Sequence, residues 1–236
     1  MKHQIAYITD LHLEEQFPKD QGVDCQKNWE QILQDVTSRG IDHIIIGGDI
    51  GEYSVNKIFF QSLNTFQVDV SPGNHDSSSE IVKHFNPGIL NSQEKLYYRK
   101  DYNPYTFLFL DSSLGVIDPE QLLWLEKQLA SAQKAIICIH HPIIEVPTEV
   151  DRLYSLLNRD QVQQVLQNSQ KEITLFSGHY HLDDERTIGL IRQYVSPASS
   201  FQVAKLPDDI QIDTNSFGYR ILTLQESEIQ TEVILF

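Results

Sequence analysis

The chain is poor in cysteine, with only Cys25 and Cys138 among its 236 residues. Small secreted proteins that depend on disulfides carry several pairs, so this sequence has no disulfide framework. Cys138 lies within the apolar run 135–139, where we expect a small buried hydrophobic residue. The near absence of cysteine favours a reducing compartment, and we predict a cytoplasmic protein.

Long hydrophobic runs are also missing. No apolar stretch approaches the roughly 20 residues that a transmembrane helix needs. Residues 1–4 lead directly into a predicted strand, without the apolar core of a signal peptide. We therefore expect no membrane partner. A hydrophobic content of 40% can fill a substantial core, and the length fits a single domain over residues 1–236.

Positive charge is scarce. The chain has 18 Lys and Arg against 33 Asp and Glu, for a formal net charge of −15. Proteins bind nucleic acid polymers largely by neutralising phosphates with Lys and Arg, so a polymer partner is disfavoured. The net negative charge does not exclude a small phosphoester substrate, because bound divalent cations would reverse the sign of the electric field near the site.

The chain does contain five short apolar runs, each followed by a polar cluster. We read the runs as buried strands: 5–9, 43–46, 67–70, 135–139 and 173–176. The clusters that follow are Asp10-Leu11-His12, Gly48-Asp49-Ile50-Gly51-Glu52, Gly73-Asn74-His75-Asp76, His140-His141-Pro142 and Gly178-His179-Tyr180-His181. Because ligands bind at the carboxyl ends of strands in α/β proteins, the clusters are expected to converge. Their oxygen and imidazole donors suit manganese, iron, zinc or cobalt.

The order of the predicted elements indicates an α/β fold. Strands and helices alternate in the first half, which favours parallel strands with right-handed crossovers. The predicted elements there are strand 5–9, helix 26–38, strand 43–46, helix 55–63, strand 67–70 and helix 79–85. The second half is richer in strands, at 95–99, 105–111, 188–195, 218–224 and 229–236, with helices that begin at Pro119 and Arg159. We expect two sheets face to face, with helices outside.

Taken together, the five clusters resemble the motifs of the calcineurin-like metallophosphoesterases. The resemblance implies a four-layer α/β/β/α sandwich of two mixed sheets. It also implies a dinuclear metal site that activates a hydroxide for phosphoester hydrolysis. One metal would be held by Asp10, His12 and His181, and the other by Asn74, His140 and His179. Asp49 would bridge the two.

The same resemblance gives catalytic roles to residues beside the metals. His75 would contact the substrate together with Asn74, and would donate a proton to the leaving oxygen or stabilise the transition state. A histidine in that role needs a partner that fixes its tautomer. Glu52 is our candidate, because protein phosphatases of the family carry an acid three residues after the bridging aspartate. Asp76 is the alternative, and His141 either contacts substrate or merely packs.

Further segments resemble the class III cyclic-nucleotide phosphodiesterases. They are Leu110-Asp111-Ser112, Leu123-Trp124-Leu125, Ser196-Pro197-Ala198-Ser199 and Gly218-Tyr219-Arg220. These segments also fit glycerophosphodiesterases. The sequence departs from many relatives in having Ile143 after His-Pro, and in being shorter. The resemblance implies a phosphodiesterase acting on a small substrate such as a cyclic nucleotide.

Other functions of the same fold remain alternatives at this point. They are a phosphomonoesterase, a nuclease and a non-catalytic metal-binding scaffold. The acidic composition argues against the nuclease, and the complete ligand set argues against the scaffold. The apolar C-terminal strand, residues 233–236, is either core or a pairing edge, so a homo-oligomer stays open.

Overall fold

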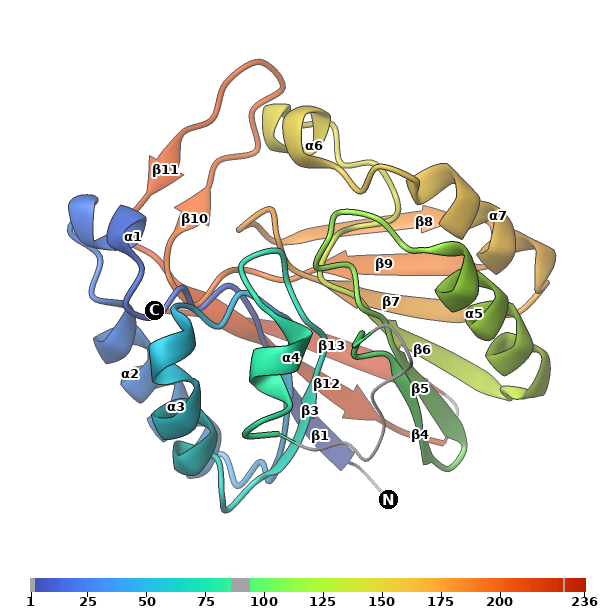
Figure 1. Cartoon of the computed structure of the whole chain (residues 1–236), viewed down its shortest axis with the longest axis horizontal. Helices are drawn as coiled ribbons and strands as arrows, with labels where there is room; N and C mark the ends of the chain where they lie inside the picture. Colours follow the sequence, from blue (N-terminus) through green and yellow to red (C-terminus); the bar gives the residue numbers. More distant parts are fainter. Residues whose placement is uncertain (1–2, 86–93, 227) are drawn as a thin grey trace.

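The computed structural model describes residues 3–85, 94–226 and 228–236 (Figure 1). Its first half contains β1 (His3–Ile8), α1 (Gln16–Asp20), α2 (Cys25–Ser38), β2 (His43–Ile46), η1 (Tyr53–Val55), α3 (Asn56–Ser62), β3 (Gln67–Val70) and α4 (Ser78–Ile81). The middle of the chain contains β4 (Tyr98–Tyr102), β5 (Tyr105–Phe109), α5 (Pro119–Ser131), β6 (Lys134–Cys138), α6 (Glu149–Tyr154) and α7 (Arg159–Asn168). The last third contains β7 (Ile173–Ser177), β8 (Asp184–Ile188), β9 (Ile191–Val195), β10 (Gln202–Val203), β11 (Ile212–Asp213), β12 (Gly218–Leu224) and β13 (Ile229–Leu235).

Two large mixed sheets organise these elements. The first has the order β13-β12-β1-β2-β3, in which β1, β2 and β3 are parallel and β12 and β13 are antiparallel additions. The second has the order β4-β5-β6-β7-β9-β8, with β5, β6, β7 and β9 parallel. The predicted parallel pairing of the first three strands is therefore confirmed.

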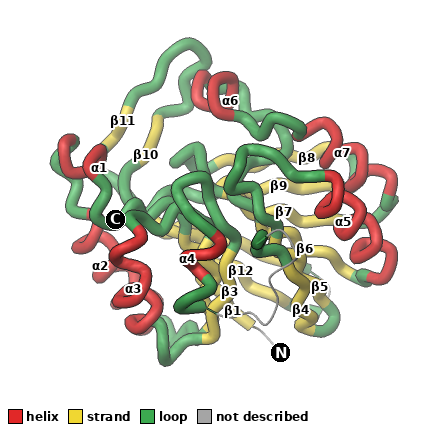
Figure 2. Tube along the Cα trace, viewed as in Figure 1, coloured by secondary structure: helices red, strands yellow, loops and turns green. Residues whose placement is uncertain are grey.

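Helices cover the outer faces of both sheets. Figure 1 shows α2 and α3 beside the first sheet and α5 and α7 beside the second, and Figure 2 shows the same separation of helix from strand. Helix α2 buries Trp29, Ile32 and Val36, which recur at the spacing of one helical face. Helix α5 begins as predicted, because the Asp118 side chain accepts a hydrogen bond from the amide of Gln121. These layers confirm the predicted α/β/β/α sandwich.

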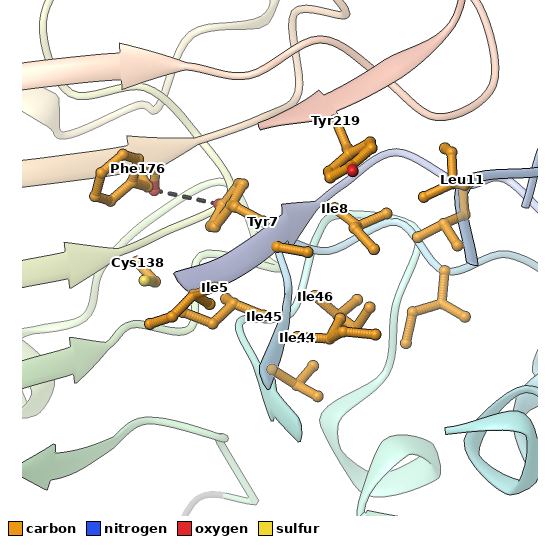
Figure 3. Close-up of a cluster of buried hydrophobic side chains, with 14 of the residues drawn as sticks. Ile5, Tyr7, Ile8, Leu11, Ile44, Ile45, Ile46, Cys138, Phe176 and Tyr219 are labelled. Atoms are coloured by element: carbon orange, nitrogen blue, oxygen red, sulfur yellow. Dashed lines mark hydrogen bonds between the residues drawn. The ribbon is translucent and has the colours of Figure 1, made fainter. Parts of the chain in front are cut away.

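The interior between the sheets is apolar and close-packed. Tyr7 of β1 points toward Phe176 of β7, and its hydroxyl donates a hydrogen bond to the Phe176 carbonyl at 3.2 Å (Figure 3). Cys138 of β6 lies in the same layer and is fully buried. This packing matters for the site, because it fixes the ends of the two sheets relative to each other.

The structure also corrects several predicted boundaries. The strand predicted at 188–195 contains β9 but begins too early, because β8 and β9 form an antiparallel hairpin that turns at Gly189, whose φ is +59°. Strand β4 lies later than predicted, because it pairs with β5 as far as the Asn103-Pro104 turn. Helix α4 ends at Ile81, before the predicted end at Phe85. Helices α1 and α6 were not predicted.

None of the helices among the described residues has the length and apolar content to cross a membrane.

Candidate metal centre

Two groups of side chains that could each hold a metal lie side by side at the carboxyl ends of the parallel strands. The first is Asp10, His12 and His181, and the second is Asp49, His140 and His179. Within each group the ligand atoms lie within 4.8 Å of one another. Six of the seven predicted ligands are thus brought together, from segments as far apart as β1 and β7.

Asp49 lies between the two groups. Its Oδ2 is 3.7 Å from His12 Nε2 in the first group and 3.2 Å from His140 Nε2 in the second. Its Oδ1 accepts a hydrogen bond from the backbone amide of His75. A carboxylate at this position can share its oxygens between two cations, which is the arrangement expected of a bridging ligand.

Each of the four histidines has one ring nitrogen in a hydrogen bond with an oxygen outside these two ligand groups. The other ring nitrogen can therefore offer its lone pair to a metal at the centre of the site. The tied pairs are His12 Nδ1 with Glu15 Oε2 (3.0 Å), His140 Nδ1 with the Gly47 carbonyl (2.8 Å), His179 Nε2 with the Tyr154 carbonyl (2.8 Å) and His181 Nδ1 with the Phe201 carbonyl (2.9 Å). Orienting partners of this kind are typical of metal-ligating histidines.

One nitrogen at the centre of the site makes no hydrogen bond. His140 Nε2 is buried and faces Asp49 Oδ2 and Asp10 Oδ1, at 3.2 and 3.8 Å. A buried polar atom without a hydrogen bond is costly unless something else satisfies it. Two buried carboxylates and four imidazoles are a donor set suited to divalent metals. The residues present therefore fit the two metal ions that the sequence implies.

The charges of these groups are strongly coupled in the protein without metal. Burial opposes ionisation of Asp10 and Asp49, but the neighbouring histidines, His140 chief among those beside Asp49, hold the pKa of both carboxyls below its usual range. Conversely, Asp49 and then Asp10 raise the pKa of His140 to about 10, against the effect of burial. Burial and the charge of His140 lower the pKa of His179 to about 4. The two ionised carboxylates therefore stabilise positive charge at the centre of the site.

The backbone at the site adopts an uncommon conformation. Five of the candidate ligands have a positive φ: Asp10 (55°), His12 (49°), Asp49 (54°), His179 (70°) and His181 (52°). Such left-handed conformations are uncommon in residues other than glycine, and sparsely populated backbone conformations of this kind cost about 1–3 kcal/mol each. Strain of this size persists where the surrounding structure enforces it. The left-handed backbone directs neighbouring side chains, such as those of Asp10 and His12, toward the centre of the site.

Two glycines allow the close approach that this geometry needs. A Cβ on Gly178 would lie 2.1 Å from Thr9 Oγ1 and 2.4 Å from Asp10 Oδ2. A Cβ on Gly73 would lie 2.1 Å from Asp49 Oδ1. Both glycines are therefore required by the space that the two carboxylates occupy.

His75 contacts a carboxylate that the sequence did not single out. Its Nδ1 is 3.1 Å from Glu15 Oε2, the oxygen that also contacts His12 Nδ1. The hydrogen bond to Glu15 raises the pKa of His75 to about 9. Among the described residues no ion pair joins His75 to Glu52, so the structure gives His75 a different partner from the predicted one. The only signal for Glu15 is an acid three residues after His12, and Glu14 beside it is equally acidic.

Asp76, the alternative partner for His75, holds the backbone instead. Its Oδ2 accepts hydrogen bonds from the amides of Asp49 and Gly73, both at 2.8 Å, and its Oδ1 accepts one from Ile50 at 3.0 Å. Asp76 therefore closes the turn that carries His75 and fixes the loop that carries Asp49.

The two remaining predicted residues lie at the same end of the sheets. Asn74 is exposed in the turn between Gly73 and His75, both of which contact Asp49. His141 is buried, with its ring centroid 4.1 Å from that of His179 and its Nδ1 2.9 Å from Ser112 Oγ. Burial lowers the pKa of His141 well below its usual value. Its position supports the His179 ring, whereas its contact with substrate stays a prediction.

Hollow surface alone does not identify this site. A groove of about 780 Å³ lies at the opposite, amino ends of β5, β6, β7 and β9, far along the strands from the ligand groups. We assign the functional site to the carboxyl ends of the strands because the candidate ligand side chains converge there.

Comparison with known proteins agrees with this geometry. Residues 3–183 match the calcineurin-like phosphoesterase family, a span well over half of the chain. The chain belongs to this family. It is therefore a hydrolase of the metallophosphoesterase class, and the predicted family is confirmed.

Individual relatives are similar over most of their length. A probable cyclic nucleotide phosphodiesterase of Fibrobacter succinogenes is 26% identical over 238 residues, which are 97% of this chain and 92% of the relative. The 3′,5′-cyclic adenosine monophosphate phosphodiesterase CpdA of Vibrio vulnificus is 26% identical over 254 residues, which are 97% of this chain and 88% of the relative. Among solved structures, a dimetal phosphatase from Danio rerio shares the fold, with a TM-score of 0.65 at 14% identity and coverage of 97% and 98% of the two chains.

Proposed function

We propose that this phosphoesterase is a metal-dependent phosphodiesterase that acts on a small substrate such as a cyclic nucleotide. The observation that carries the proposal is the pair of ligand groups with Asp49 between them and His75 beside them. The relatives named as cyclic nucleotide phosphodiesterases support the choice of substrate class. The net charge of −15 supports a small substrate rather than a nucleic acid polymer.

Seven side chains would hold the metals. We assign one metal to Asp10, His12 and His181, the other to Asn74, His140 and His179, and the bridge to Asp49. When bound, the two ions supply Lewis acidity toward the phosphate oxygens and lower the pKa of water. Manganese, iron, zinc and cobalt all suit these donors.

The proton chemistry would belong to His75. Its raised pKa keeps the imidazole protonated at neutral pH, so it can donate a proton to the leaving oxygen. Because Glu15 engages Nδ1, the proton available to substrate is the one on Nε2. The His75 side chain is 45% exposed, so a substrate can reach it from solvent.

Two variants test the assignment. Asp49→Ala should lose bound metal, because it removes the shared carboxylate. His75→Ala should keep its metal and lose turnover, by about 10²–10⁴-fold for a general acid. We would measure metal content and the hydrolysis of bis(p-nitrophenyl) phosphate with manganese. Leu123→Ala, on the exposed face of α5, is the control.

The outcomes separate the alternatives. Undiminished turnover in both variants would remove the mechanism. Two bound metals without hydrolysis of any phosphoester in a panel would favour the non-catalytic scaffold. Faster hydrolysis of monoesters than of diesters would favour the phosphomonoesterase, and tight, salt-sensitive DNA binding would favour the nuclease. The single domain over 1–236, the cytoplasmic location and the oligomeric state stay predictions.

A further inference from the structure

A separate cavity of about 270 Å³ opens beside His75. Its lining includes Glu15 and Phe17 from the segment after β1, and Glu52 and Tyr53 from the segment after β2. This volume lies just below the roughly 300–1,000 Å³ of sites that enclose a whole drug-sized ligand. The cavity therefore suits one planar group of a substrate whose phosphate lies at the metal centre.

The aromatic lining of this cavity is unusually exposed. Phe17 and Tyr53 are each 51% accessible to solvent. Among the large hydrophobic side chains that are exposed in the described ranges, only three are aromatic: these two and Tyr154. All three lie around the candidate metal centre, since the Tyr154 carbonyl accepts the hydrogen bond from His179. Exposed aromatic rings gathered at one place indicate a binding surface.

The two walls of the cavity are held at a fixed separation. The Leu13 amide donates to the Ile50 carbonyl at 2.9 Å, and the Glu52 amide donates to the Leu13 carbonyl at 3.0 Å. At Gly51 the backbones approach so closely that a Cβ would lie 2.2 Å from the Leu13 oxygen. The cavity is thus formed before any ligand enters.

An aromatic path connects this cavity with the metal centre. The Phe17 ring lies 5.8 Å from Phe201, in an edge-on arrangement. Phe201 in turn lies 4.4 Å from the ring of His181. A planar group that contacts Phe17 is therefore close to the ligands of the first metal group.

Charge decides which part of a substrate fits here. Glu15 and Glu52 both line the cavity and would repel a phosphate. Glu15 is already engaged by His12 and His75, whereas Glu52 has no side-chain partner in the part of the chain that the structure describes. A carboxylate only accepts hydrogen bonds, so Glu52 favours a group that carries amino donors.

We propose that the cavity lined by Phe17 and Tyr53 binds the nucleobase of the substrate, with Glu52 accepting a hydrogen bond from the amino group of adenine. This inference rests on the proposed function and adds the residues that select the substrate. Every base has a face that stacks on aromatic rings, while the amino group distinguishes adenine from hypoxanthine.

Equilibrium binding of nucleotides tests the inference without turnover. We would titrate the manganese-loaded protein calorimetrically with adenosine 5′-monophosphate, inosine 5′-monophosphate and ribose 5-phosphate. Phe17→Ala and Tyr53→Ala should each weaken binding of the adenine nucleotide by about 10- to 100-fold. Both should leave ribose 5-phosphate unchanged, because it lacks a base. Phe17→Tyr and Tyr53→Phe keep the ring and should bind as the wild type does, as should Leu123→Ala.

Kinetics and a third variant complete the test. The KM for 3′,5′-cyclic adenosine monophosphate should rise in Phe17→Ala and Tyr53→Ala with little change in kcat, because the base does not react. Glu52→Gln should reduce the preference for the adenine over the hypoxanthine nucleotide.

Several results would overturn the proposal. They are equal affinity of the wild type for the adenine nucleotide and ribose 5-phosphate, unchanged binding in both alanine variants, and loss of binding in Tyr154→Ala alone. The last would place the base on the other side of the centre. A wild-type preference for the hypoxanthine nucleotide would remove the role of Glu52. Selective nucleotide binding without hydrolysis of any diester would instead refute the phosphodiesterase and leave this subsite standing.

Discussion

Glu15 gives the sharpest prediction, because one oxygen of this side chain contacts both a candidate metal ligand and the candidate acid. Glu15 Oε2 lies 3.0 Å from His12 Nδ1 and 3.1 Å from His75 Nδ1, and the Glu15 side chain is only 13% exposed. Burial alone would raise the pKa of Glu15, but hydrogen bonds from His12 and His75 lower it to about 2. Glu15 is therefore ionised, and both of its contacts are charge-assisted.

Replacing Glu15 with Gln keeps the shape of the side chain and removes its charge. A hydrogen bond to a charged group contributes about 1.5–3 kcal/mol. Loss of an orienting partner of a metal-ligating histidine typically lowers metal affinity or activity 10- to 100-fold. That factor corresponds to about 1.4–2.7 kcal/mol, which is close to the contribution of one such hydrogen bond. We expect kcat to fall 10- to 100-fold because His75 is no longer held in position, and metal affinity to fall because His12 is freed.

The assay would separate these two effects. Turnover of bis(p-nitrophenyl) phosphate would be measured at saturating manganese, where only the effect through His75 remains, and manganese affinity would be measured independently. Glu14→Gln is a matched control, because Glu14 is a neighbouring acid that pairs with Lys19 at the surface. Glu52→Gln tests the partner that the sequence predicted, and we expect its kcat on this substrate to stay unchanged. Wild-type kcat and metal affinity in Glu15→Gln, or a larger loss of kcat in Glu52→Gln, would refute the reasoning.

Three further predictions follow from the site. Gly178→Ala should displace Asp10, destabilise the protein by about 1–3 kcal/mol and reduce the amount of bound metal. Chemical denaturation and metal analysis would measure the two effects, and full metal occupancy would contradict the close approach of Gly178 to Asp10. Since Asp49 and Asp10 raise the pKa of metal-free His140 to about 10, protonation there stabilises the metal-free fold fully below pH 6.5, and the contribution is lost as pH rises through about 10. Metal must displace that proton, so its apparent affinity should rise with pH between 7 and 9, and calorimetry in buffers of different ionisation enthalpy should detect the released proton. Removing metal with a chelator should lower the thermal midpoint, because a ligand at 100 times its Kd adds about 2.7 kcal/mol to stability; identical melting curves would exclude a metal bound to the folded state alone.

Much of the fold was predictable because short hydrophobic segments of the sequence mark most of its central strands. The ranges 43–46 and 67–70 match β2 and β3, since β2 is a short run that is buried throughout and β3 is buried at its carboxyl end. The hairpin β8–β9 was predicted only in part, because the range 188–195 contains β9 but not β8 as a separate strand. Its outer strand β8 has several exposed residues, so hydrophobicity does not mark it, and the turn depends on one glycine.

Glu14 and Glu15 show where sequence reasoning ends at the site. They are identical in type and adjacent, yet Glu14 has a φ of 64° and ends on the surface, while Glu15 turns inward to His12 and His75. That difference arises from backbone angles in a loop, which no residue pattern specifies. The same holds for Glu52, whose distance from Asp49 along the chain suits a partner for His75 but whose side chain lies on the exposed wall of a cavity.

The sequence by itself determined which residues gather, because each polar cluster follows a buried strand and the carboxyl ends of parallel strands meet at one edge. Only the tertiary structure decided how they act on one another: which nitrogen of each histidine faces the centre, which carboxylate holds His75, and which aromatic rings stand open beside it. These depend on left-handed loop conformations and on contacts between segments far apart in the chain, and those contacts exist only once both sheets have packed together.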